Sequence, residues 1–310
     1  RVSKFMMPIL IVLSVLIAVY SVTRPGAMEG VKYFLVPNVK NFSWMTVVAA
    51  MGQMFYSLSI AMGILITFGS YMKKETSLED STRNVEVFDT AIAIMAGLMI
   101  IPAVFSFSGG DPDTLQAGPA LMFITIPKVF ENMGFGTVVG ILFFLLVLFA
   151  AVTSSIALTE SAVSTFEDEL GWSRRRATVL VGVIMIALGS LSSLGYGPLV
   201  GIKIIGMQFL DFFDFLTNSV MMPIAAMLTS LFVSRIVGMK RMEEEIMHGE
   251  STFRRKKIFI VMIKYLCPVF ALIILISSVA TAFGWIAMEK GDTNFEFISD
   301  TQTLFWIRHP

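Results

Sequence analysis

The sequence predicts an all-α membrane protein, a polytopic bundle of transmembrane helices. Of its 310 residues, 55% are hydrophobic and only 15% are charged, and the mean hydropathy is +0.78. Too few polar residues remain to cover a soluble globule of this size, whereas a lipid-facing surface needs no polar cover. Apolar runs of about 20 residues, the length that spans the hydrocarbon core, recur along the chain. The lipid bilayer is therefore the first expected partner, and no nucleic-acid partner is expected.

The apolar runs long enough to cross the membrane define the predicted spans. They lie near 5–23, 44–72, 88–108, 136–165, 177–194, 209–237 and 257–287. A shorter apolar stretch at 118–133 contains Pro127, which favours a re-entrant or capping hairpin over a span. No soluble domain is visible, so we treat 1–310 as a single transmembrane domain.

The Lys and Arg residues orient this domain. Most of them, including the clusters at 174–176 and 254–257, fall on one side of the predicted spans. The positive-inside rule makes that side cytoplasmic and leaves 288–310 outside. Because the chain begins at Arg1 without Met, we expect a fragment of a longer protein.

The second span is unusual, because polar residues and glycines interrupt its centre. Residues 52–63 read "GQMFYSLSIAMG", so Gly52 and Gly63 bracket Gln53, Ser57 and Ser59. A helix broken within the membrane exposes backbone groups that are tolerated only where they line a cavity. The pattern therefore favours two half-helices whose ends face a ligand. Close packing of helices through small residues is the alternative.

Asp89 is an acid at the polar start of the third span, in "FDTAIAIMAGLMIIP". A carboxylate within the membrane costs about 3 kcal/mol and usually faces a partner or a cavity. It could bind an ion, or it could cap the amino terminus of the helix, since Asp is a favoured cap. The sequence leaves both interpretations open.

The fourth span contains a cluster of hydroxyls in "FAAVTSSIALTE" at 149–160. Ala150, Thr153, Ser154 and Leu158 share one helix face. Adjacent hydroxyl and carbonyl oxygens suit a small hard cation, although such hydroxyls also serve as hydrogen bonds between helices. Glu160 follows as an acid without an evident partner.

Two acids near the outer end of the sixth span, Asp211 and Asp214, indicate a gate or a cation-attracting vestibule, with simple interfacial solvation as the alternative. Lys264 is expected to extend its amine toward the interface. Cys267 is the one cysteine, which excludes an internal disulfide.

Enzymatic chemistry is not expected. His248 and His309, the only histidines, lie outside the spans, and Cys267 has neither His nor Cys within helical reach. An alternative from another class is a proton-coupled or ion-channelling subunit that uses Asp89, Glu160 and Lys264. Those three groups are too isolated to form a continuous file.

Four motifs, in order and spacing, resemble the neurotransmitter:sodium symporters, especially their bacterial amino-acid transporters. They are "GQMFYSLSIAMG", "FDTAIAIMAGLMIIPAVF", "GPALMFITIPKVF" and "FAAVTSSIAL…FEDEL". The resemblance covers the fifth to eleventh family helices, from Ser3 to about Trp285. It implies an inverted-repeat transporter fold with a discontinuous helix at 44–71, and it implies that the first family helices are missing from this chain.

The resemblance also assigns roles, which we carry over only to matching residues. It implies substrate contacts at Tyr56, Ser57, Ser59, Met62, Ser154 and Leu158. It implies a first sodium site at Ser57 and Asp89, and a second at Ala150, Thr153 and Ser154. The outer gate would hold Gln53 and Asp214, the inner gate would hold Tyr71 and Asp168, and the hairpin 111–133 would cap the outer vestibule.

Departures from the family pattern refine the expected function. Many members carry Asn where Asp89 stands, and chloride-dependent members carry Ser at the position of Ala93. The carboxylate of Asp89 could supply the negative charge that chloride supplies elsewhere. Met62 replaces an aromatic residue, and its flexible thioether indicates bulky apolar substrates. We therefore expect sodium-coupled, chloride-independent symport of an apolar amino acid by a multi-pass protein of the plasma (inner) membrane.

Overall fold

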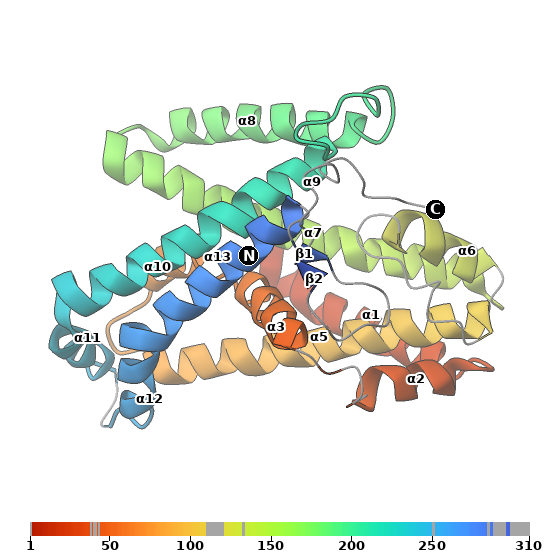
Figure 1. Ribbon diagram of the computed structural model, residues 1–310, viewed down its shortest axis with the longest axis horizontal. Coiled ribbons are helices and arrows are strands. Elements are labelled where there is room, and N and C mark those ends of the chain that lie inside the picture. Colours follow the sequence, from red (N-terminus) through yellow and green to blue (C-terminus); the bar gives the residue numbers. More distant parts are fainter. Residues whose placement is uncertain are drawn as a thin grey trace. The chain divides into compact units, whose positions relative to one another are not determined.

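The computed structural model describes residues 2–37, 39, 42, 44–109, 121–131, 134–249, 252–283, 286–287 and 296–297. Its helices are α1 (Val2–Val22), α2 (Ala27–Leu35), α3 (Trp44–Ser57), α4 (Ile64–Ser70), α5 (Leu78–Ser108), α6 (Ile126–Glu131), α7 (Gly136–Leu170), α8 (Arg174–Leu194), α9 (Phe209–Asp214), α10 (Met222–Phe232), α11 (Met239–Ile246), α12 (Lys256–Val261) and α13 (Cys267–Ala282) (Figure 1). Four π-helical segments adjoin them, η3 (Leu121–Thr125), η4 (Phe215–Met221), η5 (Val233–Gly238) and η6 (Met262–Leu266). Two short antiparallel strands, β1 (Ile286–Ala287) and β2 (Glu296–Phe297), follow α13.

Long apolar helices dominate the described residues. Six are long and apolar enough to cross a membrane: Lys4–Val22, Leu78–Ser108, Gly136–Leu170, Arg174–Leu194, Phe209–Ile246 and Lys256–Ala282. The predicted span 44–72 is absent from this set because it is divided into α3 and α4, each too short by itself.

Helix α5 begins earlier than its apolar run. The helix starts at Leu78, well before the predicted span start at 88, and Ser77 caps it by accepting the Asp80 backbone N–H across 3.0 Å. The additional turns are polar, so hydropathy alone could not find them. Because Asp89 lies about three turns into this helix, the interpretation of Asp89 as an amino-terminal cap is wrong.

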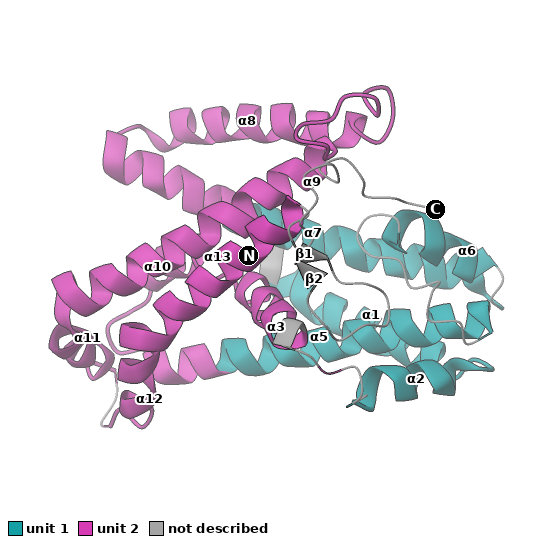
Figure 2. Cartoon of the chain, viewed as in Figure 1, with its two compact units in different colours: residues 1–39, 84–157 teal, residues 40–83, 158–310 magenta. Residues whose placement is uncertain are grey.

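The chain divides into two compact units, which we describe separately (Figure 2). The first comprises residues 1–39 and 84–157 and contains α1, α2, most of α5, η3, α6 and the first part of α7. Its core packs residues from α1, α5, α6 and α7, including Ile17, Val104, Ile126, Val129 and Phe143. The Ser21 hydroxyl donates to the Met99 carbonyl across 2.8 Å and ties α1 to α5.

The second unit comprises residues 40–83 and 158–310. It contains α3, α4, the start of α5, the end of α7 and the helices from α8 to α13. Val163 of α7 packs with Ala177 and Val181 of α8 in a small buried cluster. Helices α10 and α13 pack against each other, and the Ser230 hydroxyl donates to the Ile263 carbonyl across 3.0 Å.

About half of the predicted hairpin 111–133 lies outside the described residues. Its described part, 121–131, forms η3 and then α6. The structure does not describe the rest of the hairpin, 111–120 and 132–133, or nearly all of 288–310.

Candidate functional site

The helix interruption is the most distinctive backbone feature. Helix α3 ends at Ser57 and α4 begins at Ile64, so residues 58–63 form a non-helical linker. In this linker Ser59 has φ 55°, Ala61 has φ 63° and Gly63 has φ 78°. A left-handed conformation costs about 1–2 kcal/mol for a residue with a Cβ atom. Such strained positions cluster at ligand-binding sites, where the surrounding structure maintains them.

Most of the residues expected to touch substrate lie at this linker. Tyr56 and Ser57 are the last two residues of α3, whereas Ser59 and Met62 belong to the linker itself. The Ser59 N–H donates to the Tyr56 carbonyl across 3.0 Å, and the Met62 N–H donates to the Ser59 carbonyl across 3.4 Å. These turns replace the helical ladder and hold the four residues within one short stretch of the second unit.

Gly63 fits its position for two reasons. Its φ is in the left-handed region, where glycine has no steric cost. A Cβ atom at this position would also come within 2.7 Å of the Ser161 hydroxyl oxygen. The start of α4 therefore approaches α7 more closely than any other residue type would allow.

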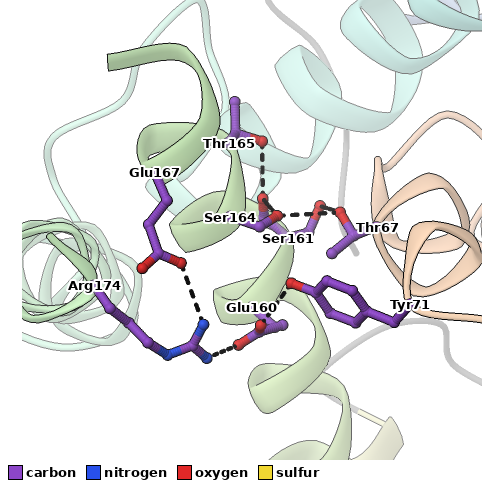
Figure 3. Close-up of polar contacts among 8 residues, drawn as sticks. All are labelled: Thr67, Tyr71, Glu160, Ser161, Ser164, Thr165, Glu167 and Arg174. Carbon is purple, nitrogen blue, oxygen red and sulfur yellow. Dashed lines mark hydrogen bonds and ion pairs between the residues drawn. The ribbon is translucent and has the colours of Figure 1, made fainter. Parts of the chain in front are cut away.

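A cluster of hydroxyls joins α4 to α7 beside this close approach (Figure 3). Thr67 is buried, and its hydroxyl donates to the Ser161 hydroxyl across 3.3 Å and lies 3.4 Å from the Ser164 hydroxyl oxygen. The Ser164 and Thr165 hydroxyls donate to the Ser161 carbonyl across 3.1 and 2.9 Å. Sequence reasoning missed this cluster, although the spacing of Ser161, Ser164 and Thr165 places them on one helix face.

Glu160 of α7 is the centre of a second polar network (Figure 3). This network meets α4 at Tyr71, one turn after Thr67. The Tyr71 hydroxyl donates to Glu160 Oε1 across 2.9 Å. Arg174 Nη2 lies 2.5 Å from Glu160 Oε2, and Arg174 Nη1 lies 3.2 Å from Glu167 Oε2. The Glu160 side chain is 22% exposed and the Arg174 side chain is 58% exposed. Glu160 therefore has a partner on each side, which the sequence did not reveal.

The turn between α7 and α8 brings Arg174 back to Glu160. Gly171 has φ 62° and ends α7 after Leu170. The Trp172 ring then stacks on the Phe166 ring, with centroids 5.7 Å apart, and α8 begins at Arg174. The guanidinium thus reaches two acids that lie seven and fourteen positions earlier in the chain. The sequence alone shows Arg174 only as one of the positive charges on the cytoplasmic side.

The two predicted inner-gate residues, Tyr71 and Asp168, differ in their contacts. Tyr71 joins the network through Glu160, whereas Asp168 is exposed and has no hydrogen bond or ion pair with the described residues.

At the predicted outer gate, the Asn218 amide donates to the Asp214 carboxylate, and Gln53 lies one turn before Ser57 in α3. Leu158 lies in the same unit, on α7.

The expected second sodium site lies on α7 in the first unit. The Thr153 hydroxyl donates to the Ala150 carbonyl across 2.9 Å and to the Phe149 carbonyl across 3.0 Å. Two of the expected oxygen ligands therefore lie side by side, and Ser154 follows directly in the helix. Hard oxygen donors of this kind suit a small cation.

The two expected ligands of the first sodium site belong to different units. Ser57 is the last residue of α3 in the second unit, whereas Asp89 is half-buried within α5 in the first unit. Among the described residues, no group of three or more His, Cys, Asp or Glu side chains could hold a metal ion.

Comparison with known proteins decides the family. The model of the Sodium:neurotransmitter symporter family matches residues 2–306. The chain belongs to this family. The resemblance inferred from the four motifs is therefore confirmed, as is the expected multi-pass location in the plasma membrane. The family is one of symporters and not of enzymes.

Individual members of the symporter family are similar over most of the chain. An uncharacterised sodium-dependent transporter of Bacillus subtilis (strain 168), YhdH, is 35% identical over 251 residues, which are 81% of this chain and 55% of the relative. A second, from Haemophilus influenzae, is 32% identical over 279 residues, 90% of this chain and 60% of the relative. The chain thus spans little more than half of the length of these relatives.

A solved structure of the family supports the fold. The crystal structure of MhsT in complex with L-phenylalanine has 35% sequence identity and a TM-score of 0.75, and the match covers 89% of this chain and 62% of that one. The predicted fold class, an all-α transporter bundle with a discontinuous helix, is therefore confirmed.

Proposed function

We propose that this symporter-family chain takes part in sodium-coupled symport of an apolar amino acid across the plasma membrane by alternating access. The observation that carries the proposal is the strained linker 58–63 within an apolar segment. A break in the helical ladder within a membrane span is tolerated where it lines a cavity or a ligand site. Family membership, sodium-dependent relatives and a homologue bound to L-phenylalanine support the same assignment.

The proposed substrate contacts come from the linker and from α7. Tyr56, Ser57, Ser59 and Met62 would form one wall, and Ser154 and Leu158 would border the substrate from α7. Met62 supplies a flexible thioether that adapts to varied apolar shapes. Because MhsT was crystallised with L-phenylalanine, large apolar side chains are the first to test.

Sodium would provide the driving force. Its movement down the membrane potential releases about 2.3 kcal/mol per charge for each 100 mV. We propose Ser57 and Asp89 as ligands of one ion, and Ala150, Thr153 and Ser154 as ligands of another. Sodium bound beside the substrate raises substrate affinity, and linkage requires the substrate to raise sodium affinity equally.

We propose the Tyr71, Glu160 and Arg174 network as the core of the inner gate. It ties the end of α4 to α7 and to the start of α8, so it must break if α4 moves away from α7. Asp168 remains a proposed member, and Gln53 and Asp214 remain proposed members of the outer gate. In alternating access, one gate is closed while the other is open.

Chloride independence is part of the proposal. The carboxylate of Asp89 would supply negative charge beside the proposed first sodium site, where a neutral side chain would leave the sodium charge uncompensated. The charge of Asp89 would thus replace bound chloride.

Proton coupling through Asp89, Glu160 and Lys264 is the competing function. The contacts of Glu160 disfavour it, because an acid engaged by Arg174 and Tyr71 is held as a carboxylate by both partners. Uptake by the full-length protein in liposomes, with either a sodium gradient or a pH gradient, separates the two functions. We expect amino-acid uptake driven by sodium alone and insensitive to chloride; uptake driven by the pH gradient would support the competing function.

A further inference from the structure

A polar hollow of about 390 Å³ lies in the second unit and shares no residue with the proposed transport site. The start of α5 and the segment before α12 form its walls. Its lining residues are Ser77, Glu79, Asp80, Arg83, Gly249, Thr252, Arg254 and Arg255.

Backbone contacts build this hollow and hold its two walls together. The Arg254 backbone N–H donates to Glu79 Oε2 across 3.1 Å. A Cβ atom on Gly249 would come within 2.6 Å of the Thr76 carbonyl oxygen, so the two segments touch there as well. Neither contact uses an arginine side chain, so the guanidiniums can be altered without removing the contacts that join the walls.

The charges of the lining favour an anion. Three arginines face two acids, and Glu79 already accepts the Arg254 backbone N–H. The guanidiniums of Arg83 and Arg254 make no hydrogen bond or ion pair with the rest of the described chain. The amino-terminal end of the long helix α5 adds a partial positive charge. Guanidinium groups bind phosphate oxygens through paired hydrogen bonds, which an ammonium group cannot do.

The position of the hollow adds a second argument. It lies where two apolar helices start, Leu78–Ser108 and Lys256–Ala282. Helix ends of this kind reach the level of the lipid phosphates in a bilayer. We propose that the hollow binds a phosphate group through Arg83 and Arg254, supplied either by an anionic lipid or by a soluble phosphate compound.

Binding to the purified full-length protein tests this proposal. Inorganic phosphate is titrated by calorimetry at low ionic strength, with chloride as the reference anion. Phosphatidic acid is tested against phosphatidylcholine by native mass spectrometry. Phosphate binding in solution would identify a soluble source, whereas retention of phosphatidic acid alone would identify a lipid headgroup.

A pair of double variants makes the result specific. We expect Arg83→Gln with Arg254→Gln to weaken binding about tenfold or more, because charge-assisted hydrogen bonds are lost. Arg235→Gln with Lys240→Gln removes the same charge elsewhere in the second unit and should leave binding unchanged. Sodium-dependent amino-acid binding, measured in parallel, reports whether each variant is folded. An equal loss in both double variants, or binding of neither probe above its reference, would overturn the proposal.

Discussion

The Tyr71 hydroxyl donates a hydrogen bond to the Glu160 carboxylate across 2.9 Å, and Arg174 occupies the other oxygen of that carboxylate. This arrangement joins the end of the second half-helix to α7 and α8. An opening of the proposed inner gate must break it, so its strength should bias the protein between closed and open states.

Removing the Tyr71 hydroxyl should favour the open inner gate. A hydrogen bond of this kind contributes about 1 kcal/mol, so Tyr71→Phe should increase the open population about fivefold. Labelling of Ser164→Cys by a membrane-impermeant maleimide from the cytoplasmic side measures the change, in a background that carries Cys267→Ala. Tyr265→Phe removes an exposed hydroxyl elsewhere and serves as the control. Equal labelling of the Tyr71 and Tyr265 variants would argue against a gate at Glu160.

Gly63→Ala should destabilise the folded protein for two separable reasons. The left-handed φ should cost about 1–2 kcal/mol, and the added Cβ would clash with the Ser161 hydroxyl. Adding Ser161→Ala should relieve the clash, but it should not remove the free-energy cost of the left-handed backbone conformation. Thermal unfolding of the two single variants and the double variant separates these contributions. Gly69 is the penultimate residue of α4, and a Cβ atom there meets no atom within 4 Å, so Gly69→Ala should not destabilise the protein. If Ser161→Ala recovered nothing, the close approach of α4 to α7 would be refuted.

Replacement of Thr153 should weaken sodium binding. Thr153→Val removes one oxygen of the proposed second site, and we expect an apparent sodium affinity about tenfold lower or more. Thr153→Ser keeps the oxygen and should retain the affinity. Thr165→Val is a matched control, because the Thr165 hydroxyl also donates to a carbonyl of its own helix, across 2.9 Å. Sodium titration of amino-acid binding makes the comparison, and an unchanged affinity in Thr153→Val would remove Thr153 from the site.

Neutralising Asp89 should create a chloride requirement. Asp89→Asn keeps the size of the side chain but removes the charge that we propose replaces chloride. Sodium-dependent uptake by this variant should fall when gluconate replaces chloride, whereas uptake by the unaltered protein should not. An Asp89→Asn protein that became no more sensitive to chloride would contradict this role.

Much of the fold could be predicted from the sequence, since apolar length and the positions of Gly and Pro depend on local physical rules. The interruption after Ser57 was predicted because glycines and polar residues at mid-span disfavour a continuous helix. The left-handed φ of Ser59 and Ala61 was not, because neither residue type prefers it. The start of α5 at Leu78 was missed because its first turns are polar, which made Asp89 resemble a cap.

The residues of the candidate site could be predicted only where they belong to a recognisable sequence motif. Thr153 and Ala150 are neighbours on one helix, so their contact follows from helical spacing. The partners of Glu160 depend on tertiary structure: Tyr71 lies far away in sequence, and Arg174 returns through a turn that Gly171 makes possible. Helical periodicity contains no information about either contact.

The most direct test of the central claim is binding of radiolabelled apolar amino acids to the purified full-length protein, in sodium and then with sodium replaced by potassium. We predict saturable binding of at least one of them, L-phenylalanine being the first to try, that requires sodium and is abolished by Asp89→Ala and by Thr153→Ala. Binding that is indifferent to the replacement of sodium would contradict sodium-coupled symport and would direct attention to proton coupling through Glu160.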